Sequence, residues 1–219
     1  MSAKYPRTFH LPWSPGGTND DKRIPDVEHL VDRALVITEK LDGSNVCLTS
    51  EAVFARSHAG PPKHPSFSPL KALHAAVRDR MPTYLSFFGE WCYAVHSIRY
   101  DHLPHHLNLF GVRDDEAKVW LSWDEVKFWA KVLEVKFVPH VESVDLDGVQ
   151  ELESLTNRLG RYESRYGSTR EGLVVRPHGP VSDEAFSRFV LKWVREDHVQ
   201  TDEHWLKGSF DVQPLGKRE

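Results

Sequence analysis

Apolar residues along this chain form short β-branched runs that alternate with longer helical patterns. The runs ALVIT at 34–38 and NVCLT at 45–49 predict two strands, and Asp42-Gly43 between them predicts a turn. Between 70 and 80 the apolar residues recur at spacings of three and four, which predicts a helix with one buried face. Further strands are predicted over 53–57, 85–93, 107–112, 119–121, 136–140, 172–176 and 189–194.

Two more helices and two irregular segments complete the pattern. Ser122 and Glu125 have the spacing of a capping box, which predicts a helix that continues to Leu133. A second helix is predicted over 149–162, whereas the first 25 residues and 58–68 are rich in turn-forming residues and predict an arm and a loop. Because strands and helices alternate without a steady βαβ repeat, we expect an α+β domain with a mainly antiparallel sheet.

Composition places the chain among globular proteins. Hydrophobic residues make up 40% of it and charged residues 27%, which is far from the composition of a disordered chain. The 219 residues suffice for one full-sized core. The chain lacks an apolar run of about 18 residues, and its start, Met-Ser-Ala-Lys-Tyr-Pro-Arg, lacks a secretion signal, so we expect a cytoplasmic protein with no membrane association.

Three groups of residues suggest sites, each with a simpler interpretation beside the functional one. Cys47 and Cys92 are isolated in apolar segments, so we expect buried thiols. His102, His105 and His106 lack zinc-finger spacing and predict a surface loop over 101–108. The net charge of −4 argues against a uniformly nucleic-acid-binding surface. A local cluster that could line a phosphate-binding cleft, or in its first three members form a solvated helix face, contains Arg158, Arg161, Arg165, Arg170, Arg176, Arg188, Lys192 and Arg195.

Five short segments with chemically informative residues follow one another along the chain. A KxDG string alone is weak evidence, because it arises by chance in many proteins. The segments are Lys40-Leu41-Asp42-Gly43, Phe88-Gly89-Glu90-Trp91, Leu109-Phe110-Gly111-Val112, Glu171-Gly172-Leu173-Val174-Val175-Arg176 and Val190-Leu191-Lys192-Trp193. In this order they resemble the motifs of the covalent lysine nucleotidyltransferases, a superfamily of ATP-dependent RNA ligases, DNA ligases and mRNA capping enzymes. The resemblance extends from Glu39 to Trp193.

The resemblance implies a single α+β nucleotidyltransferase domain with mainly antiparallel sheets flanked by helices and an ATP cleft between them. It divides the chain into an N-terminal arm packing on the domain (1–33), the catalytic domain (34–195) and a short C-terminal tail (196–219). Lys40 is then the nucleophile that takes AMP from ATP, Lys192 is the second catalytic lysine, and Phe110 stacks on adenine. The implied nucleotide-binding residues are Glu39, Lys40, Arg56, Glu90, Phe110, Glu171 and Lys192, and the implied ligands of Mg²⁺ or Mn²⁺ are Asp42, Glu90 and Glu171.

Elementary chemistry agrees with these roles and raises one difficulty. A lysine has a pKa near 10.4, so a nearby cation, either Mg²⁺ or Lys192, is expected to lower the pKa of Lys40 toward about 7 to 8. The fifth motif departs from the Lys-x-Lys that related enzymes often carry, because Val194 stands at the second position. Arg195 is one residue further along, and on a strand it would point to the opposite face from Val194.

The length of the chain after Lys192 distinguishes between the classes of enzyme in this superfamily. Only 27 residues follow it, too few for the oligonucleotide-binding domain that DNA ligases and capping enzymes attach there, and 193–205 are expected to form a short helical tail. The resemblance therefore favours an RNA ligase that joins RNA 5′-phosphate and 3′-hydroxyl ends, acts in RNA repair and can need an end-healing kinase or phosphatase as partner. A DNA ligase, a capping-type enzyme and a catalytically silent nucleotide- or RNA-binding module are the alternatives.

Overall fold

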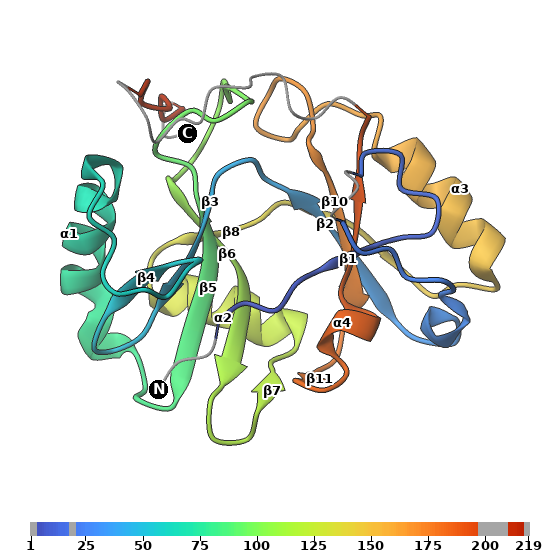
Figure 1. The fold of residues 1–219 in the computed structure, drawn as a ribbon, viewed down its shortest axis with the longest axis horizontal. Helices are drawn as coiled ribbons and strands as arrows, with labels where there is room; N and C mark the ends of the chain where they lie inside the picture. The colour runs from blue at the N-terminus through green and yellow to red at the C-terminus, as the bar shows by residue number, and fades with distance from the viewer. Residues whose placement is uncertain (1–3, 18–20, 197–209, 217–219) are drawn as a thin grey trace.

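The computed structural model describes residues 4–17, 21–196 and 210–216, which form two β-sheets with helices on their outer sides (Figure 1). The first sheet, here called sheet A, has antiparallel neighbours except for β1 and β12, which run parallel. Its strands, in spatial order, are β1 (Phe9–His10), β12 (Leu191–Val194), β10 (Gly172–Pro177), β2 (Leu35–Lys40) and β9 (His140–Val144).

The second sheet, sheet B, is antiparallel except where β8 pairs with β6. Its strands, in spatial order, are β11 (Val181–Ser182), β7 (Val119–Trp120), β6 (Leu107–Asp114), β5 (Leu85–Trp91), β3 (Ser44–Leu48) and β4 (Val53–Ala55), with β8 (Lys136–Phe137) beside β6. The chain passes from sheet A to sheet B between β2 and β3, so Lys40 lies where the two sheets meet.

Helices cover the sheets and bury their apolar faces. Ser122 and Glu125 form the predicted capping box, with reciprocal side-chain to main-chain bonds of 3.4 and 2.8 Å. One apolar core joins α1 and α2 to sheet B, and a second joins α3 to sheet A. The helices are α1 (Ser68–Val77), α2 (Trp123–Val132), α3 (Val149–Leu159) and α4 (Phe186–Phe189), with short 3₁₀ turns at Glu28–Leu30, Pro65–Phe67 and Arg78–Arg80.

A third apolar cluster lies between the sheets and includes a residue of the N-terminal arm. Tyr5 packs edge-on against Phe110, Trp120 and Phe186, with ring centroids 4.9 to 5.2 Å apart. Phe88 completes the cluster at 5.5 Å from the Tyr5 ring. Because aromatic pairs in these geometries add stability beyond area burial, Tyr5 fastens the arm to sheet B.

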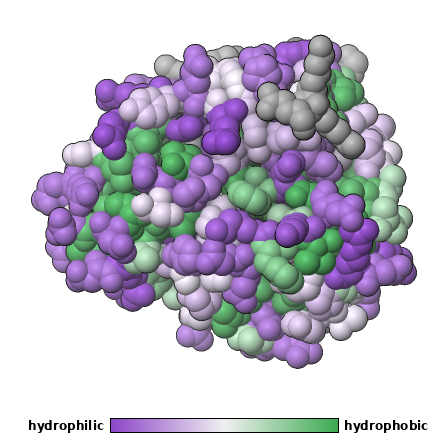
Figure 2. All heavy atoms as spheres, turned by 180° about the vertical axis from the view of Figure 1, so that it is seen from behind, coloured by the Kyte–Doolittle hydropathy of each residue, from purple (hydrophilic) through white to green (hydrophobic). Residues whose placement is uncertain are grey.

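Exposed apolar side chains are dispersed over the part of the outer surface that Figure 2 shows. On the side shown in Figure 2, apolar side chains lie in separate patches among polar ones. Among the described residues, none of the helices is long and apolar enough to cross a membrane. Within the part of the chain that the structure describes, the large apolar side chains that are exposed come from scattered positions, which are Tyr84, Phe128, Tyr162, Val212 and Leu215.

The α+β class and the mainly antiparallel pairing are confirmed, and both cysteines are buried free thiols as expected. Four short elements were missed, namely β1, β9, β11 and α4, and α4 takes Phe189 out of the last predicted strand. The predicted helical tail does not begin at 193, because Trp193 and Val194 belong to β12, and 197–209 lie outside the described residues. Residues 210–216 pack on the segment after β5, where Gln213 bonds to Ile98 and Tyr100.

Candidate active site

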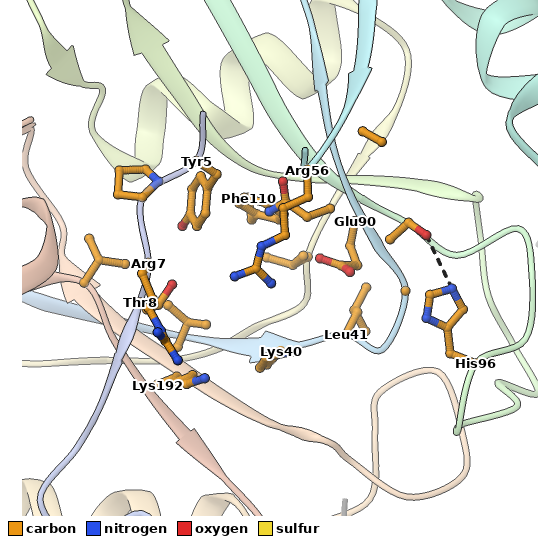
Figure 3. A pocket seen from close by; sticks show the side chains of 18 of the residues that line it. Tyr5, Arg7, Thr8, Lys40, Leu41, Arg56, Glu90, His96, Phe110 and Lys192 are labelled. Carbon is orange, nitrogen blue, oxygen red and sulfur yellow. Dashed lines mark hydrogen bonds between the residues drawn. The ribbon is translucent and has the colours of Figure 1, made fainter. Parts of the chain in front are cut away.

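A cavity of about 840 Å³ lies between the two sheets and gathers most of the predicted site residues (Figure 3). Lys40 is the last residue of β2, and Lys192 lies on β12 of the same sheet. Glu90 and Phe110 come from β5 and β6 of sheet B, and Arg56 directly follows β4. All five line the cavity, although they are spread over more than 150 residues of sequence. The structure therefore brings these five predicted residues together.

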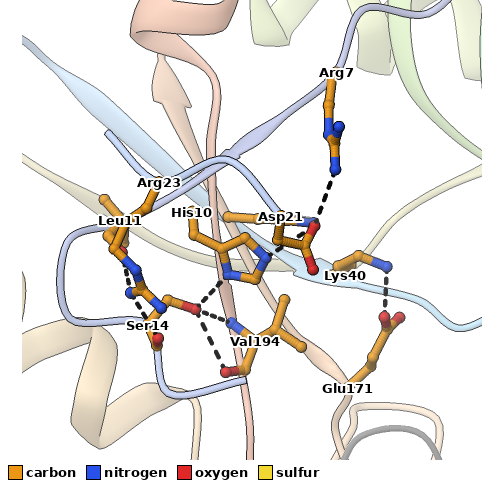
Figure 4. Close-up of polar contacts among 10 residues, drawn as sticks. Arg7, His10, Leu11, Ser14, Asp21, Arg23, Lys40, Glu171 and Val194 are labelled. Atoms are coloured by element: carbon orange, nitrogen blue, oxygen red, sulfur yellow. Dashed lines mark hydrogen bonds and ion pairs between the residues drawn. The ribbon is translucent and has the colours of Figure 1, made fainter. Parts of the chain in front are cut away.

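The ε-amino group of Lys40 makes an ion pair with Glu171 (Figure 4). Lys40 Nζ donates to Glu171 Oε1 at 2.6 Å, and the antiparallel register that pairs Lys40 with Gly172 places the two side chains together. The carboxylate of Glu171 is 8% exposed, and its second oxygen, Oε2, is buried without a hydrogen-bond partner. Glu171 is not on the cavity wall, but through Lys40 it acts on the group that faces the cavity.

The charges around Lys40 act against its predicted activation. Burial works to lower the pKa of Lys40, but Glu171 and Glu90 outweigh it and hold the pKa above its ordinary value. Burial raises the pKa of Glu90 to about 8, with a smaller raising effect from Glu171 and an opposing effect from Lys40. The predicted lowering of the Lys40 pKa by Lys192 is therefore wrong for the protein's own charges, because Lys40 is surrounded by carboxylates. Lys192 itself is bonded to Asp21, with 3.0 Å between Nζ and Oδ1.

Glu39 and Asp42 occupy the predicted motif, but each carboxylate is engaged in holding a neighbouring segment. Successive side chains of a strand point to opposite faces, so Glu39 points away from the side of Lys40. Its Oε2 accepts the Arg165 main-chain N–H at 3.1 Å and lies 3.6 Å from Arg170 Nε. Asp42 Oδ2 accepts the main-chain N–H groups of residues 97 and 98, each at 2.7 Å. Glu39 therefore lines the cavity with its carboxylate committed to Arg165 and Arg170, and Asp42 has one oxygen bonded to the loop after β5.

The arginine-rich segment between 158 and 195 does not line a single cleft. Arg176 and Lys192 reach the cavity, whereas Arg170 is buried against Glu39. Arg195 borders a second, smaller cavity of about 420 Å³ and is not among the residues that line the cavity around Lys192. The residues at 158, 161 and 165 are all exposed, but only Arg158 belongs to a helix, because α3 ends at Leu159 and the other two lie in turns after it.

Sequence analysis missed the N-terminal arm as part of the site. Tyr5, Pro6, Arg7 and Thr8 line the cavity together with Asp21. The arm is held by the β1–β12 pairing and by a buried serine, Ser14, whose Oγ accepts the Val194 N–H at 2.9 Å. At Gly16 the arm also approaches the residue after β12 so closely that a Cβ there would lie 2.0 Å from the main-chain oxygen of Arg195. The two residues of β1 are too few to give a periodic signal.

Comparison with known proteins gives one family and one recurring fold. A family model described as RNA ligase matches residues 33–194. Among solved structures, Naegleria gruberi RNA ligase with PPi matches at 21% identity and a TM-score of 0.57, covering 78% of this chain and 52% of that one. Two variants of that enzyme, each solved with ATP and Mn, match at 18% and 16% identity with TM-scores of 0.54, covering 80% and 89% of this chain and 53% and 61% of theirs. No curated protein matches significantly. The chain thus spans little more than half the length of these structures, and at such identities the likeness shows the fold.

Proposed function

The chain belongs to the RNA ligase family, and we propose that it is an ATP-dependent RNA ligase acting through a covalent Lys40–AMP intermediate. The observation that carries the proposal is the single cavity shared by Lys40, Glu90, Phe110 and Lys192. A covalent nucleotidyltransferase needs a nucleophile, a base-binding face and cations for the phosphates in one place, and this cavity supplies all three. The neighbouring Naegleria structures were solved with ATP and Mn or with PPi, which are the reactants and product such a reaction uses.

The proposed reaction has three displacements at phosphorus. The Lys40 amine, once deprotonated, attacks the α-phosphorus of ATP; the Nζ–P bond forms, and the bond to the β-phosphate oxygen breaks and releases pyrophosphate. An oxygen of an RNA 5′-phosphate then attacks the same phosphorus; the new O–P bond joins AMP to the RNA end, and the Lys40 Nζ–P bond breaks as the lysine nitrogen takes back a proton. A 3′-hydroxyl finally attacks that 5′-phosphate, gives up its proton and releases AMP, which leaves a phosphodiester.

The residues of the cavity fit distinct parts of the first displacement. Glu171 Oε1 is 2.6 Å from Lys40 Nζ and is the group placed to receive the lysine proton. Lys192 lies on the next strand but one and supplies positive charge for the α-phosphate as pyrophosphate leaves. Phe110 offers an apolar ring to adenine. Arg56 is exposed at the cavity wall, where it can contact the RNA end that is to be joined.

A divalent cation fits this site only if the nucleotide supplies part of its ligands. Within the described residues, no group of three or more His, Cys, Asp or Glu side chains is arranged to hold a metal ion. Glu171 Oε2 is buried without a partner, and Glu90 faces the cavity, so these two carboxylates are the oxygen donors for a cation shared with ATP phosphates. When bound, Mg²⁺ or Mn²⁺ would neutralise phosphate charge.

The test is intact mass spectrometry of the protein after incubation with ATP and Mg²⁺ in the absence of RNA. We expect a gain of one AMP in the wild type and in a Lys71→Ala control, an exposed lysine on α1, and no gain in Lys40→Ala. Added pyrophosphate should remove the adduct. Absence of an adduct in the wild type would sink the proposal and leave a binding module, whereas labelling by GTP instead of ATP would indicate a capping-type enzyme.

A second test separates RNA from DNA as substrate and locates the reaction in RNA repair. The enzyme should seal RNA with a 5′-phosphate and a 3′-hydroxyl, and the same ends in DNA should be poor substrates. RNA with a 5′-hydroxyl or a 3′-phosphate should be joined only after an end-healing kinase or phosphatase has acted. Preferential sealing of DNA would contradict the RNA ligase proposal while leaving the Lys40 chemistry intact.

A further inference from the structure

We propose that Arg7 of the N-terminal arm binds the pyrophosphate portion of ATP together with Lys192, and that Asp21 pairs with both cations until the phosphates take its place. This inference rests on the proposed function and adds to it a phosphate-binding residue from outside the five motifs. It also supplies the second cation that the fifth motif lacks at Val194.

One carboxylate oxygen joins the groups concerned. Asp21 Oδ1 lies 3.0 Å from Lys192 Nζ and 3.9 Å from a terminal nitrogen of Arg7. Because both distances end on the same atom, the two cationic groups are close neighbours. Figure 4 shows Arg7 and Asp21 directed toward each other, and Figure 3 shows the ends of Arg7 and Lys192 on the same side of Lys40.

The direction of the nucleotide places the phosphates at these cations. Phe110 belongs to sheet B, whereas Lys40 and Lys192 belong to sheet A. An ATP molecule with adenine on Phe110 and its α-phosphate at Lys40 therefore runs from one sheet to the other. Its remaining phosphates meet groups on the side of sheet A, where the arm carries Arg7, while Arg56 follows a strand of sheet B.

The other arginines near the cavity are less suited to this role. Arg176 is buried, and its two terminal nitrogens donate to the main-chain oxygens of Phe110 and Leu121 at 3.0 and 2.8 Å. Arg195 borders the separate smaller cavity. Arg7, by contrast, lines the main cavity, and its side chain is 45% exposed. A guanidinium can bind two phosphate oxygens at once, which suits a pyrophosphate.

The contact between Arg7 and Asp21 is of a kind that phosphate can replace. At 3.9 Å it is longer than a hydrogen bond, and solvent-exposed ion pairs contribute little stability. His10 packs against the same Asp21 oxygen at 3.4 Å, but burial lowers its pKa to about 4, so it is neutral at pH 7 and does not compete as a cation. The position of the arm does not depend on the Arg7 contact, since the parallel register pairs His10 with Lys192.

The experiment measures each step separately in the wild type, Arg7→Ala, Asp21→Asn and Arg78→Ala. Arg78 is a matched control because it is also exposed and also lies near a carboxylate, with 3.7 Å to that of Asp79 against 3.9 Å between Arg7 and Asp21. The first measurement is the rate of Lys40–AMP formation against ATP concentration, and the second is its reversal against pyrophosphate concentration. The third is transfer of AMP to 5′-phosphate RNA from Lys40–AMP prepared beforehand at high ATP, a step that involves no pyrophosphate.

For Arg7→Ala we expect the half-saturating concentrations of ATP and of pyrophosphate to rise about ten- to one-hundred-fold, the effect of losing a charge-assisted hydrogen bond. Transfer of AMP to RNA should be unchanged, and Arg7→Lys should recover part of the loss. Asp21→Asn should shift pyrophosphate binding in the opposite direction, toward tighter binding, because a carboxylate that competes with phosphate for the two cations is neutralised.

The assignment would be overturned if Arg7→Ala left the dependence on ATP and pyrophosphate concentration unchanged. It would also be overturned if Arg7→Ala slowed all three steps equally, because that is the effect of losing a merely structural residue. If the wild type forms no Lys40–AMP, the proposed function fails separately. Calorimetric titration of wild type and Arg7→Ala with inorganic pyrophosphate and Mg²⁺ still tests Arg7 in that case. Equal affinity of the two proteins for pyrophosphate would refute the proposal.

Discussion

Replacing Glu90 by glutamine is expected to stabilise the folded protein at pH 8, even though Glu90 belongs to the proposed active site. Burial is the main cause that raises the pKa of this carboxyl from 4.5 to about 8; Lys40 opposes it, and the carboxylates of Glu171 and Asp42 add to it. A glutamine has nearly the same shape but no proton to lose. The folded protein therefore keeps its packing and loses the cost of ionising the side chain.

The sign and size of the effect follow from proton linkage. Below about pH 4.5 Glu90 is protonated in both the folded and the unfolded chain, and its contribution to stability is complete. As the pH rises from there to about 8, the unfolded chain releases this proton and the folded chain retains it, so the free energy of unfolding falls. At about 1.4 kcal/mol for each unit the full shift is worth about 5 kcal/mol, but Glu90 is only partly buried beside an open cavity. Screening by water reduces the expected gain of Glu90→Gln to about 1 to 3 kcal/mol at pH 8.

Urea unfolding followed by tryptophan fluorescence at pH 5, 6, 7 and 8 measures this difference. Glu153→Gln is the matched control, since Glu153 is an exposed carboxylate on α3. The stability of Glu90→Gln should exceed that of the wild type by an amount that grows from pH 5 to pH 8, while the control shows no such trend. A Glu90→Gln variant that is less stable at pH 8, or a gap that is the same at all four pH values, would refute the reasoning.

Two further predictions concern the protonation of Lys40 and the buried ion pair between Arg170 and Glu39. The rate of Lys40–AMP formation at ATP concentrations far below saturation should rise about tenfold for each pH unit between 7 and 9, because the raised pKa of Lys40 keeps the amine of the free protein protonated; a rate that is constant over this range in single-turnover measurements would contradict the prediction. Arg170→Ala should cost about 3 to 5 kcal/mol in thermal or urea unfolding, because it leaves Glu39 buried without its cation, and a double variant with Glu39→Gln should recover part of the loss. Equal losses in the single and double variants would show that the bond from Arg170 to the Leu159 oxygen is the important one.

The part of the site that sequence could predict is the part carried by strands. Lys40, Glu90, Phe110 and Lys192 each lie in or at the end of an apolar run, and alternation within a strand fixes which side chains share a face. The family resemblance then predicted that these separate runs contribute to one site. The long helix patterns and the capping box at Ser122 were also predictable, because their signals are local.

The remainder depends on partners that are distant in sequence. Glu39 and Asp42 belong to the same motif as Lys40, yet their carboxylates are committed to Arg170 and to the N–H groups of residues 97 and 98. No local pattern reveals such pairings. The arm was missed for the same reason, because β1 has two residues and gains its position only by pairing with β12.

The charge on Lys40 connects these observations. Glu171 holds the lysine proton, with a smaller effect from Glu90 where that carboxyl is ionised, and both are also the groups that would donate oxygen atoms to a divalent cation shared with ATP. A cation that engages both carboxylates would withdraw the negative charge that stabilises the ammonium form, so the same event that positions the nucleotide would lower the pKa of the nucleophile. Lys40 would then be reactive when ATP and its cation are in place and protonated otherwise. On this argument, the carboxylates that oppose activation of the lysine in the protein alone are what couple its activation to the arrival of substrate.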